Sequence, residues 1–100
     1  MANIELKQNA KEDLEHIREC ISRDSIYYAD KTIEEIVKKV ANLSIFPYMG
    51  RKIPEYNNTY LREIIYKSYR ILYKVNSNVF ILNVVHHSRE LLNSINIIKN

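Results

Sequence analysis

Cationic side chains and histidines gather in the second half of this 100-residue sequence, where together they could bind a phosphate or a carboxylate. Residues 1–50 contain seven Lys or Arg and nine Asp or Glu, whereas residues 51–100 contain eight and three. The net charge of +3 therefore comes from the second half, which would attract phosphates or an acidic partner. The candidate cations and imidazoles are Arg51, Lys52, Arg62, Lys67, Arg70, Lys74, His86, His87 and Arg89.

The spacing of these residues predicts that some of them meet at one edge of a sheet. His86 closes the last expected strand, Arg70 opens the strand before it, and Arg62 lies on the strand before that. The ends of neighbouring strands come together in an antiparallel meander. We therefore expect a cluster of guanidinium groups with one imidazole, which could hold a phosphodiester or an acidic peptide.

A structural role for the same residues is the alternative. Arginines on a sheet often pair with carboxylates, and His86 could be a core histidine with a backbone partner. Tyrosines interleaved with the cations could stack on bases, although packing of their rings in the core is the commoner outcome. The residues concerned are Glu55, Glu63, Glu90, Tyr60, Tyr66, Tyr69 and Tyr73.

Most signatures of enzymes and metal sites are absent from the sequence. One glycine cannot build a phosphate loop or a dinucleotide-binding turn. Cys20 is the single cysteine, and we expect it to pack rather than bind a metal, while His16 lies among charged positions and is expected to be solvated. The sequence therefore predicts no cofactor and no metal.

The hydrophobic pattern predicts the elements that must position the cationic residues. A short strand at 3–7 precedes two amphipathic helices, at 10–23 with Asn9 as the N-cap and at 26–44. Their short connection predicts an αα-hairpin. A loop containing both prolines and the glycine follows, and then three strands at 60–66, 69–75 and 79–85, the last one buried on both faces.

The order β-α-α-β-β-β predicts an α+β fold in which the helical hairpin packs on a curved antiparallel sheet. We expect one domain spanning residues 1–100, with no assignment for the tail at 93–100. The N-terminus lacks the features of an export signal, and no apolar run approaches the roughly 20 residues of a membrane span. With a single cysteine, these features predict a cytoplasmic protein that does not enter a membrane.

Several motifs in a fixed order resemble the RelE/ParE superfamily of toxins from bacterial type II toxin–antitoxin systems. They are an Ala-x-x-Asp-Leu helix start at 10–14, Pro-x-x-Gly-Arg at 47–51, Leu-Arg-Glu at 61–63, Tyr-Arg-Ile-x-Tyr at 69–73 and His-x-x-Arg at 86–89. The resemblance covers about residues 4–92. It implies the same β-α-α-β-β-β fold and the absence of a cofactor.

The resemblance also implies a partner, a cognate antitoxin whose C-terminal segment wraps the toxin. This segment would lay apolar side chains along the helical hairpin and could add to the sheet, in a heterotetramer or a larger assembly. The candidate antitoxin-binding residues are Ile17, Ile21, Ile33, Val37 and Val40.

Three functions follow from the resemblance. The helix start and the His-x-x-Arg ending are closer to ParE, which implies a growth-inhibiting toxin that binds DNA gyrase and stabilises plasmids, with target-binding candidates Arg51, Lys52, Arg62, Arg70, His86 and Arg89. RelE-like cleavage of mRNA on the ribosome is the alternative. In that reaction Arg62 and Arg70 would stabilise the phosphate, and His86 or His87 would move protons. The third is a non-toxic module that binds only the antitoxin.

Overall fold

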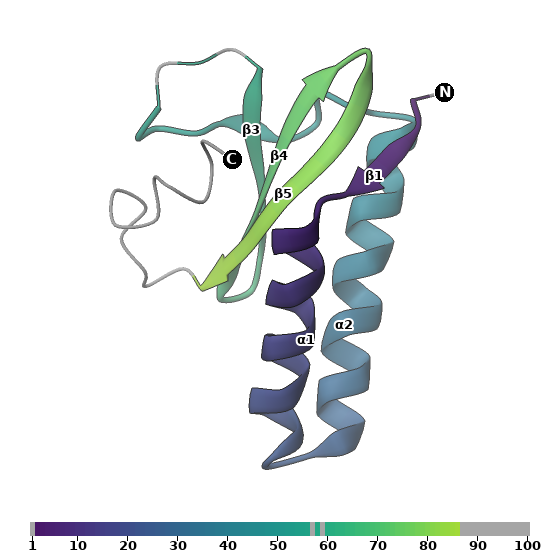
Figure 1. Ribbon diagram of the computed structural model, residues 1–100, viewed down its shortest axis with the longest axis vertical. Coiled ribbons are helices and arrows are strands. Elements are labelled where there is room, and N and C mark those ends of the chain that lie inside the picture. The colour runs from purple at the N-terminus through teal and green to yellow at the C-terminus, as the bar shows by residue number, and fades with distance from the viewer. Residues whose placement is uncertain (1, 57, 59, 87–100) are drawn as a thin grey trace.

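Two helices lie side by side against one face of a five-stranded sheet in the computed structural model, which describes residues 2–56, 58 and 60–86 (Figure 1). The far end of the helical hairpin projects past the sheet (Figure 1). The predicted α+β order is confirmed. The elements are β1 (Ile4–Leu6), α1 (Gln8–Ser22), α2 (Ile26–Ala41), the 3-10 helix η1 (Asn42–Ser44), β2 (Arg51–Lys52), β3 (Leu61–Tyr66), β4 (Tyr69–Asn76) and β5 (Asn78–His86).

The sheet is mixed, whereas the sequence predicted an antiparallel one. Its strand order is β1-β5-β4-β3-β2, and β1 pairs parallel to β5, with Ile4 beside Val79. The other neighbours are antiparallel. The predicted loop after Gly50 also contains β2, because the backbone of Arg51 and Lys52 pairs with β3. The antiparallel meander is thus correct for β3 to β5, and short strands are added at both edges.

The helix boundaries differ from the prediction at two ends. Helix α1 begins at Gln8 with Lys7 in the N-cap position and no side-chain cap, so Asn9 is not the N-cap. The reason is that β1 leads directly into the helix: Lys7 N–H still donates to Ile81 O of β5 (2.9 Å), and Lys7 O already accepts from Lys11 N–H. Helix α2 begins as predicted, with Ser25 Oγ accepting from Tyr28 N–H (3.1 Å), and its last turn tightens into η1.

The main core lies between the hairpin and the sheet. The helices contribute side chains at helical spacing, and the strands contribute alternate residues: Ala10, Ile17, Ile36, Val40, Leu43, Ile64, Ile71, Tyr73, Ile81 and Val84 are among its members. Val37, named above as an antitoxin-binding candidate, is 50% exposed, whereas Thr32 is buried. The contact face is centred on Ile36, and the next residue along a helix is turned by about 100° from it.

A smaller apolar cluster covers the opposite face of the sheet. Ile53, Leu61, Leu72 and Val85 are buried there, and Tyr56 packs against them. Since Val84 belongs to the main core and Val85 to this cluster, β5 is buried on both faces, as predicted from its apolar run. Among the described residues, no helix is both long enough and apolar enough to cross a bilayer.

Candidate functional site

The predicted cluster of Arg62, Arg70 and His86 does not form. Arg70 pairs across the ladder with Ile65, three residues after Arg62 on β3. Successive side chains on a strand alternate between its two faces, so residues that are three positions apart point to opposite sides. Arg62 therefore shares the helix-side face with its partner Tyr73, while Arg70 lies on the outer face. His86 lies opposite Tyr69 at the start of β4, whereas Arg62 pairs with Tyr73 in the middle of that strand.

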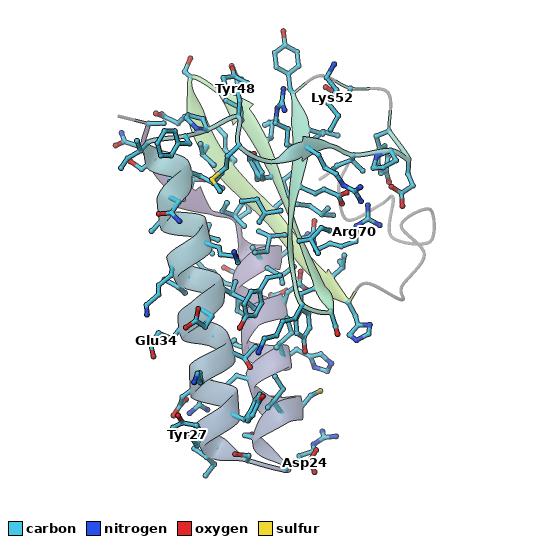
Figure 2. All side chains as sticks on the ribbon, turned by 180° about the vertical axis from the view of Figure 1, so that it is seen from behind. Asp24, Tyr27, Glu34, Tyr48, Lys52 and Arg70 are labelled. Atoms are coloured by element: carbon cyan, nitrogen blue, oxygen red, sulfur yellow. The ribbon has the colours of Figure 1, made fainter. Side chains whose placement is uncertain are left out.

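Arg70 belongs to an ion-pair network on the outer face, made of Arg51, Glu55, Glu63 and Arg70. The carboxylate of Glu63 is buried, with only 1% of the residue exposed. Its Oε1 accepts from Nε and Nη2 of Arg70, both at 2.6 Å, and its Oε2 accepts from Nε of Arg51 at 2.6 Å. The carboxylate of Glu55 accepts hydrogen bonds from Nη1 and Nη2 of Arg70, each at 2.9 Å. Figure 2 shows Arg70 directed away from the helices.

The network accounts for Arg70 being buried in spite of its charge. The residue is 5% exposed, and a buried guanidinium is tolerated only when paired and hydrogen-bonded. The hydrogen bonds that Arg70 donates to Glu55, and then to Glu63, raise its pKa above the ordinary value although burial opposes this. Glu55 and Glu63, which the sequence offered as alternative partners of the arginines, are thus the partners of Arg70, and Glu63 is also that of Arg51.

The pairing of Glu55 predicts a pH dependence of stability. The hydrogen bonds from Arg70 hold the pKa of Glu55 below its ordinary 4.5, so the folded chain takes up this proton less readily than the unfolded chain. The pairing of Glu55 therefore stabilises the folded chain above pH 4.5, and this stabilisation is lost as the pH falls through the lowered pKa. Denaturant unfolding should show a wild-type advantage over Glu55→Gln near pH 7 that shrinks as the pH falls below 4.5. An advantage that is unchanged at the low pH would contradict the pairing.

Arg62 anchors the loop that precedes β2. Its Nη1 donates to Gly50 O (2.9 Å), and its Cζ lies 5.0 Å from the centre of the Tyr48 ring. Gly50 N–H in turn donates to the hydroxyl of buried Tyr73 (2.9 Å). The Nε of Arg62 is buried and has no hydrogen-bond partner among the described residues. The backbone N–H and C=O of Gly50 are therefore both hydrogen-bonded to side chains, that of Tyr73 on β4 and that of Arg62 on β3.

His86 borders a pocket of about 240 Å³ between α1 and the ends of β4 and β5. Its ring meets the edge of the Tyr69 ring at 5.6 Å and an angle of 85°. Asp13, His16 and Cys20 of α1 also line the pocket, and Sγ of Cys20 lies 3.5 Å from Nε2 of His16. The sequence predicted a solvated His16 and a packing role for Cys20, because nothing in it showed that α1 faces the end of β5. In the described part of the chain, no group of three or more potential ligands could hold a metal ion.

Asp13 holds a β-bulge in β5 that sets the direction of His86. Leu72 pairs with Asn83 and Tyr73 with Ile81, which leaves Leu82 as the extra residue. The bulge returns Val84 to the helix-side core after Ile81. Asp13 Oδ2 accepts from the backbone N–H of Val84 (2.9 Å) and from the side-chain amide of Asn83 (3.3 Å).

Replacing Asp13 tests this role. Asp13→Ala would leave the N–H of buried Val84 without its acceptor, which costs about 1–3 kcal/mol of unfolding free energy. Asp13→Asn keeps an oxygen at the same place and should lose less. Urea unfolding of both variants measures the difference. Equal stabilities of the alanine variant and the wild type would show that the bulge does not need the hydrogen bonds to Asp13.

The remaining candidates are placed as follows. Lys52 is exposed on the edge strand β2, and Arg51 beside it is exposed apart from its bond to Glu63. His87 and Arg89, as well as Glu90, lie outside the described residues. Of the antitoxin-binding candidates, Ile17 and Val40 are buried in the core, Ile21 and Ile33 are partly buried, and Val37 is exposed.

Two groups of large apolar side chains are exposed instead. One group lies in the loop after η1 and comprises Ile45, Phe46, Tyr48 and Met49. The other begins α2 at the projecting end of the hairpin and comprises Ile26, Tyr27 and Tyr28, of which Tyr27 is labelled in Figure 2. Exposed apolar patches mark sites of interaction more often than isolated apolar residues do. The first group could have been found in the sequence, because the predicted loop contains two aromatic residues and a methionine, Phe46, Tyr48 and Met49.

Comparisons with known proteins give one family match and two solved structures with a similar fold. Residues 4–91 match the family described as "ParE toxin of type II toxin-antitoxin system, parDE". Among solved structures, the chain is similar to one of a chromosomal ParDE toxin–antitoxin system from P. aeruginosa, with a TM-score of 0.72 and 19% identity over 86% of this chain and 96% of that one. It is also similar to the toxin–antitoxin complex RelBE2 from Mycobacterium tuberculosis, with a TM-score of 0.64 and 19% identity over 85% and 96%. No curated protein sequence matches.

Proposed function

Because the chain belongs to the family of ParE toxins of type II toxin–antitoxin systems, we propose that it arrests growth by inhibiting DNA gyrase and that a cognate antitoxin neutralises it. The family match over residues 4–91 carries this proposal. The encounter with gyrase would take place in the cytoplasm. With its antitoxin the chain would form a heterotetramer or a larger assembly.

The positions of the arginines favour gyrase inhibition over RNA cleavage. Attack by a ribose 2′-OH needs groups that move protons beside a group that stabilises charge on the phosphate. In the part of the chain that the structure describes, Arg70 bonds two carboxylates on the outer face, Arg62 bonds the Gly50 loop, and His86 pairs with Tyr69 on the helix-side face. These residues thus support packing and pairing roles better than a shared role at one phosphate.

Two assays separate the functions. In a supercoiling assay with purified gyrase, the chain alone should block supercoiling, and the chain mixed with its antitoxin should not. Primer extension on translated messages should find them intact during growth arrest. Unimpeded supercoiling at excess toxin together with cut messages would replace gyrase inhibition by RelE-like cleavage. Induced expression without growth arrest would leave only the non-toxic antitoxin-binding module.

We further propose that the antitoxin covers the exposed loop of Ile45, Phe46, Tyr48 and Met49. These side chains are large, apolar and adjacent, while much of the predicted helical stripe is already packed in the core. Phe46→Ser should therefore still arrest growth but escape neutralisation by co-expressed antitoxin. Tyr27→Ser, at the distant end of the hairpin, is the matched control and should remain neutralised. Full protection of cells that carry the Phe46 variant would place the antitoxin elsewhere.

A further inference from the structure

The two carboxylates bound to Arg70 are held in different ways. Glu63 lies on β3, has a fully buried side chain and also accepts from Arg51. Glu55 lies in the segment before β3, and 32% of its side chain is exposed. Glu63 takes the Nε edge of the guanidinium, whereas Glu55 takes the outer end, where Nη1 and Nη2 form a fork. Glu55 can therefore leave without breaking the bonds between Arg70 and Glu63.

We propose that this fork of Arg70 is a binding site for an acidic side chain of a partner protein, and that Glu55 occupies it in the free chain. Without Glu55, the charges of Arg51, Glu63 and Arg70 sum to a single positive charge. The planar fork of an arginine matches both oxygens of a carboxylate, as the two equal distances of 2.9 Å to Glu55 show. An incoming Glu or Asp would form the same two bonds.

The surroundings of the fork favour a peptide over a nucleic acid. Buried apolar side chains adjoin the network on this face, among them Ile53 and Leu72. Nucleic-acid backbones bind along a row of several cations. Among the residues that the structure describes, the neighbouring cations on this face are already engaged, since Arg51 bonds Glu63 and Lys74 lies over the ring of Phe80 at 5.5 Å. Ile65, which pairs with Arg70 across the ladder, is 40% exposed, and one charge beside an exposed apolar side chain suits one carboxylate among apolar residues.

This inference goes beyond the proposed function and does not depend on it, because binding can be measured on the purified full-length chain. The probes are a capped peptide that alternates leucine and glutamate, its counterpart with glutamine, and a single-stranded RNA oligonucleotide. Calorimetry gives each affinity, and the Nε–H signal of Arg70 in nuclear magnetic resonance spectra locates the contact.

Removing Glu55 should strengthen binding of the acidic peptide. If Glu55 leaves the fork open in less than a tenth of the molecules, Glu55→Ala should bind this peptide about tenfold or more tightly than the wild type does. The glutamine peptide should bind weakly to both. Glu55→Gln retains the size of the side chain without its charge and should also gain affinity, so it serves if the alanine variant fails to fold.

Glu34→Ala is the matched control for the loss of one negative charge. Glu34 is exposed on α2, pairs with Lys38 at 3.5 Å and lies away from Arg70 (Figure 2). The affinity of the Glu34→Ala variant for the acidic peptide should stay within about twofold of that of the wild type, since a distant exposed charge is screened by salt. Equal affinities of wild type and both Glu55 variants, an equal gain in the Glu34 variant, or a preference of the Glu55 variants for RNA would each overturn the proposal.

Discussion

Gly50→Ala is expected to destabilise the protein by about 3 kcal/mol, the upper part of the range for overpacking. An added Cβ at Gly50 would lie 2.5 Å from the carbonyl oxygen of Glu63 and 2.5 Å from the hydroxyl of Tyr73. The first of these is backbone of β3, which cannot turn aside as the end of a flexible side chain can. Gly50 has no positive φ, so lack of space is the reason for this effect and backbone strain is not.

The size of the effect depends on what Gly50 connects. Tyr73 and Arg62 both bond its backbone, and β2 begins at the next residue. Moving Gly50 away from β3 would therefore weaken the edge strand and both bonds at once. Thermal and urea unfolding should show the loss, and Met49→Ala, at the exposed neighbouring position, should change stability by less than about 0.5 kcal/mol. A Gly50 variant as stable as the wild type would mean that the loop can shift freely.

The sequence predicted the elements of this fold well because each follows from a local pattern. Apolar spacing marked both helices, and Ser25 begins α2 as its capping chemistry suggests. Lys67 and Ser77, which both have positive φ, lie in the connections between the predicted strands at 60–66, 69–75 and 79–85. The two edge strands were less visible: β2 has two residues, and the parallel pairing of β1 depends on Val79, which is 75 residues away from Ile4. Such pairing is a property of the whole sheet.

The candidate site was harder to predict, because it depends on which way each side chain points. A shift of one residue in register moves a side chain to the other face of the sheet. Arg62 and Arg70 look equivalent in the sequence, yet they lie on opposite faces. The bulge at Leu82 turns the end of β5, and Asp13 supports it from a helix that is far away in the sequence. Glu55 and Glu63, the partners of Arg70, are nevertheless among the carboxylates that the sequence offers, because arginines on a sheet often pair with carboxylates.

The burial of Arg70 leads to the other large effect. Arg70→Met should cost about 3–5 kcal/mol, because it leaves the fully buried carboxylate of Glu63 with Arg51 alone. Arg18→Met is the matched control: Arg18 pairs with Asp30 at 2.8 Å, but both side chains are about half exposed, so the loss should be about 0–1 kcal/mol. Urea unfolding of the two variants at neutral pH measures both losses.

A double variant tests whether the loss in Arg70→Met comes from leaving the buried carboxylate of Glu63 without Arg70. In Arg70→Met combined with Glu63→Leu, no carboxylate remains buried, and the new side chains can join the apolar cluster of Ile53 and Leu72. The double variant should therefore be more stable than Arg70→Met alone, since replacing a buried ion pair by apolar residues is often neutral. If instead the two losses simply add, the coupling energy between the two side chains is zero, and Glu63 would not be the charge that requires Arg70.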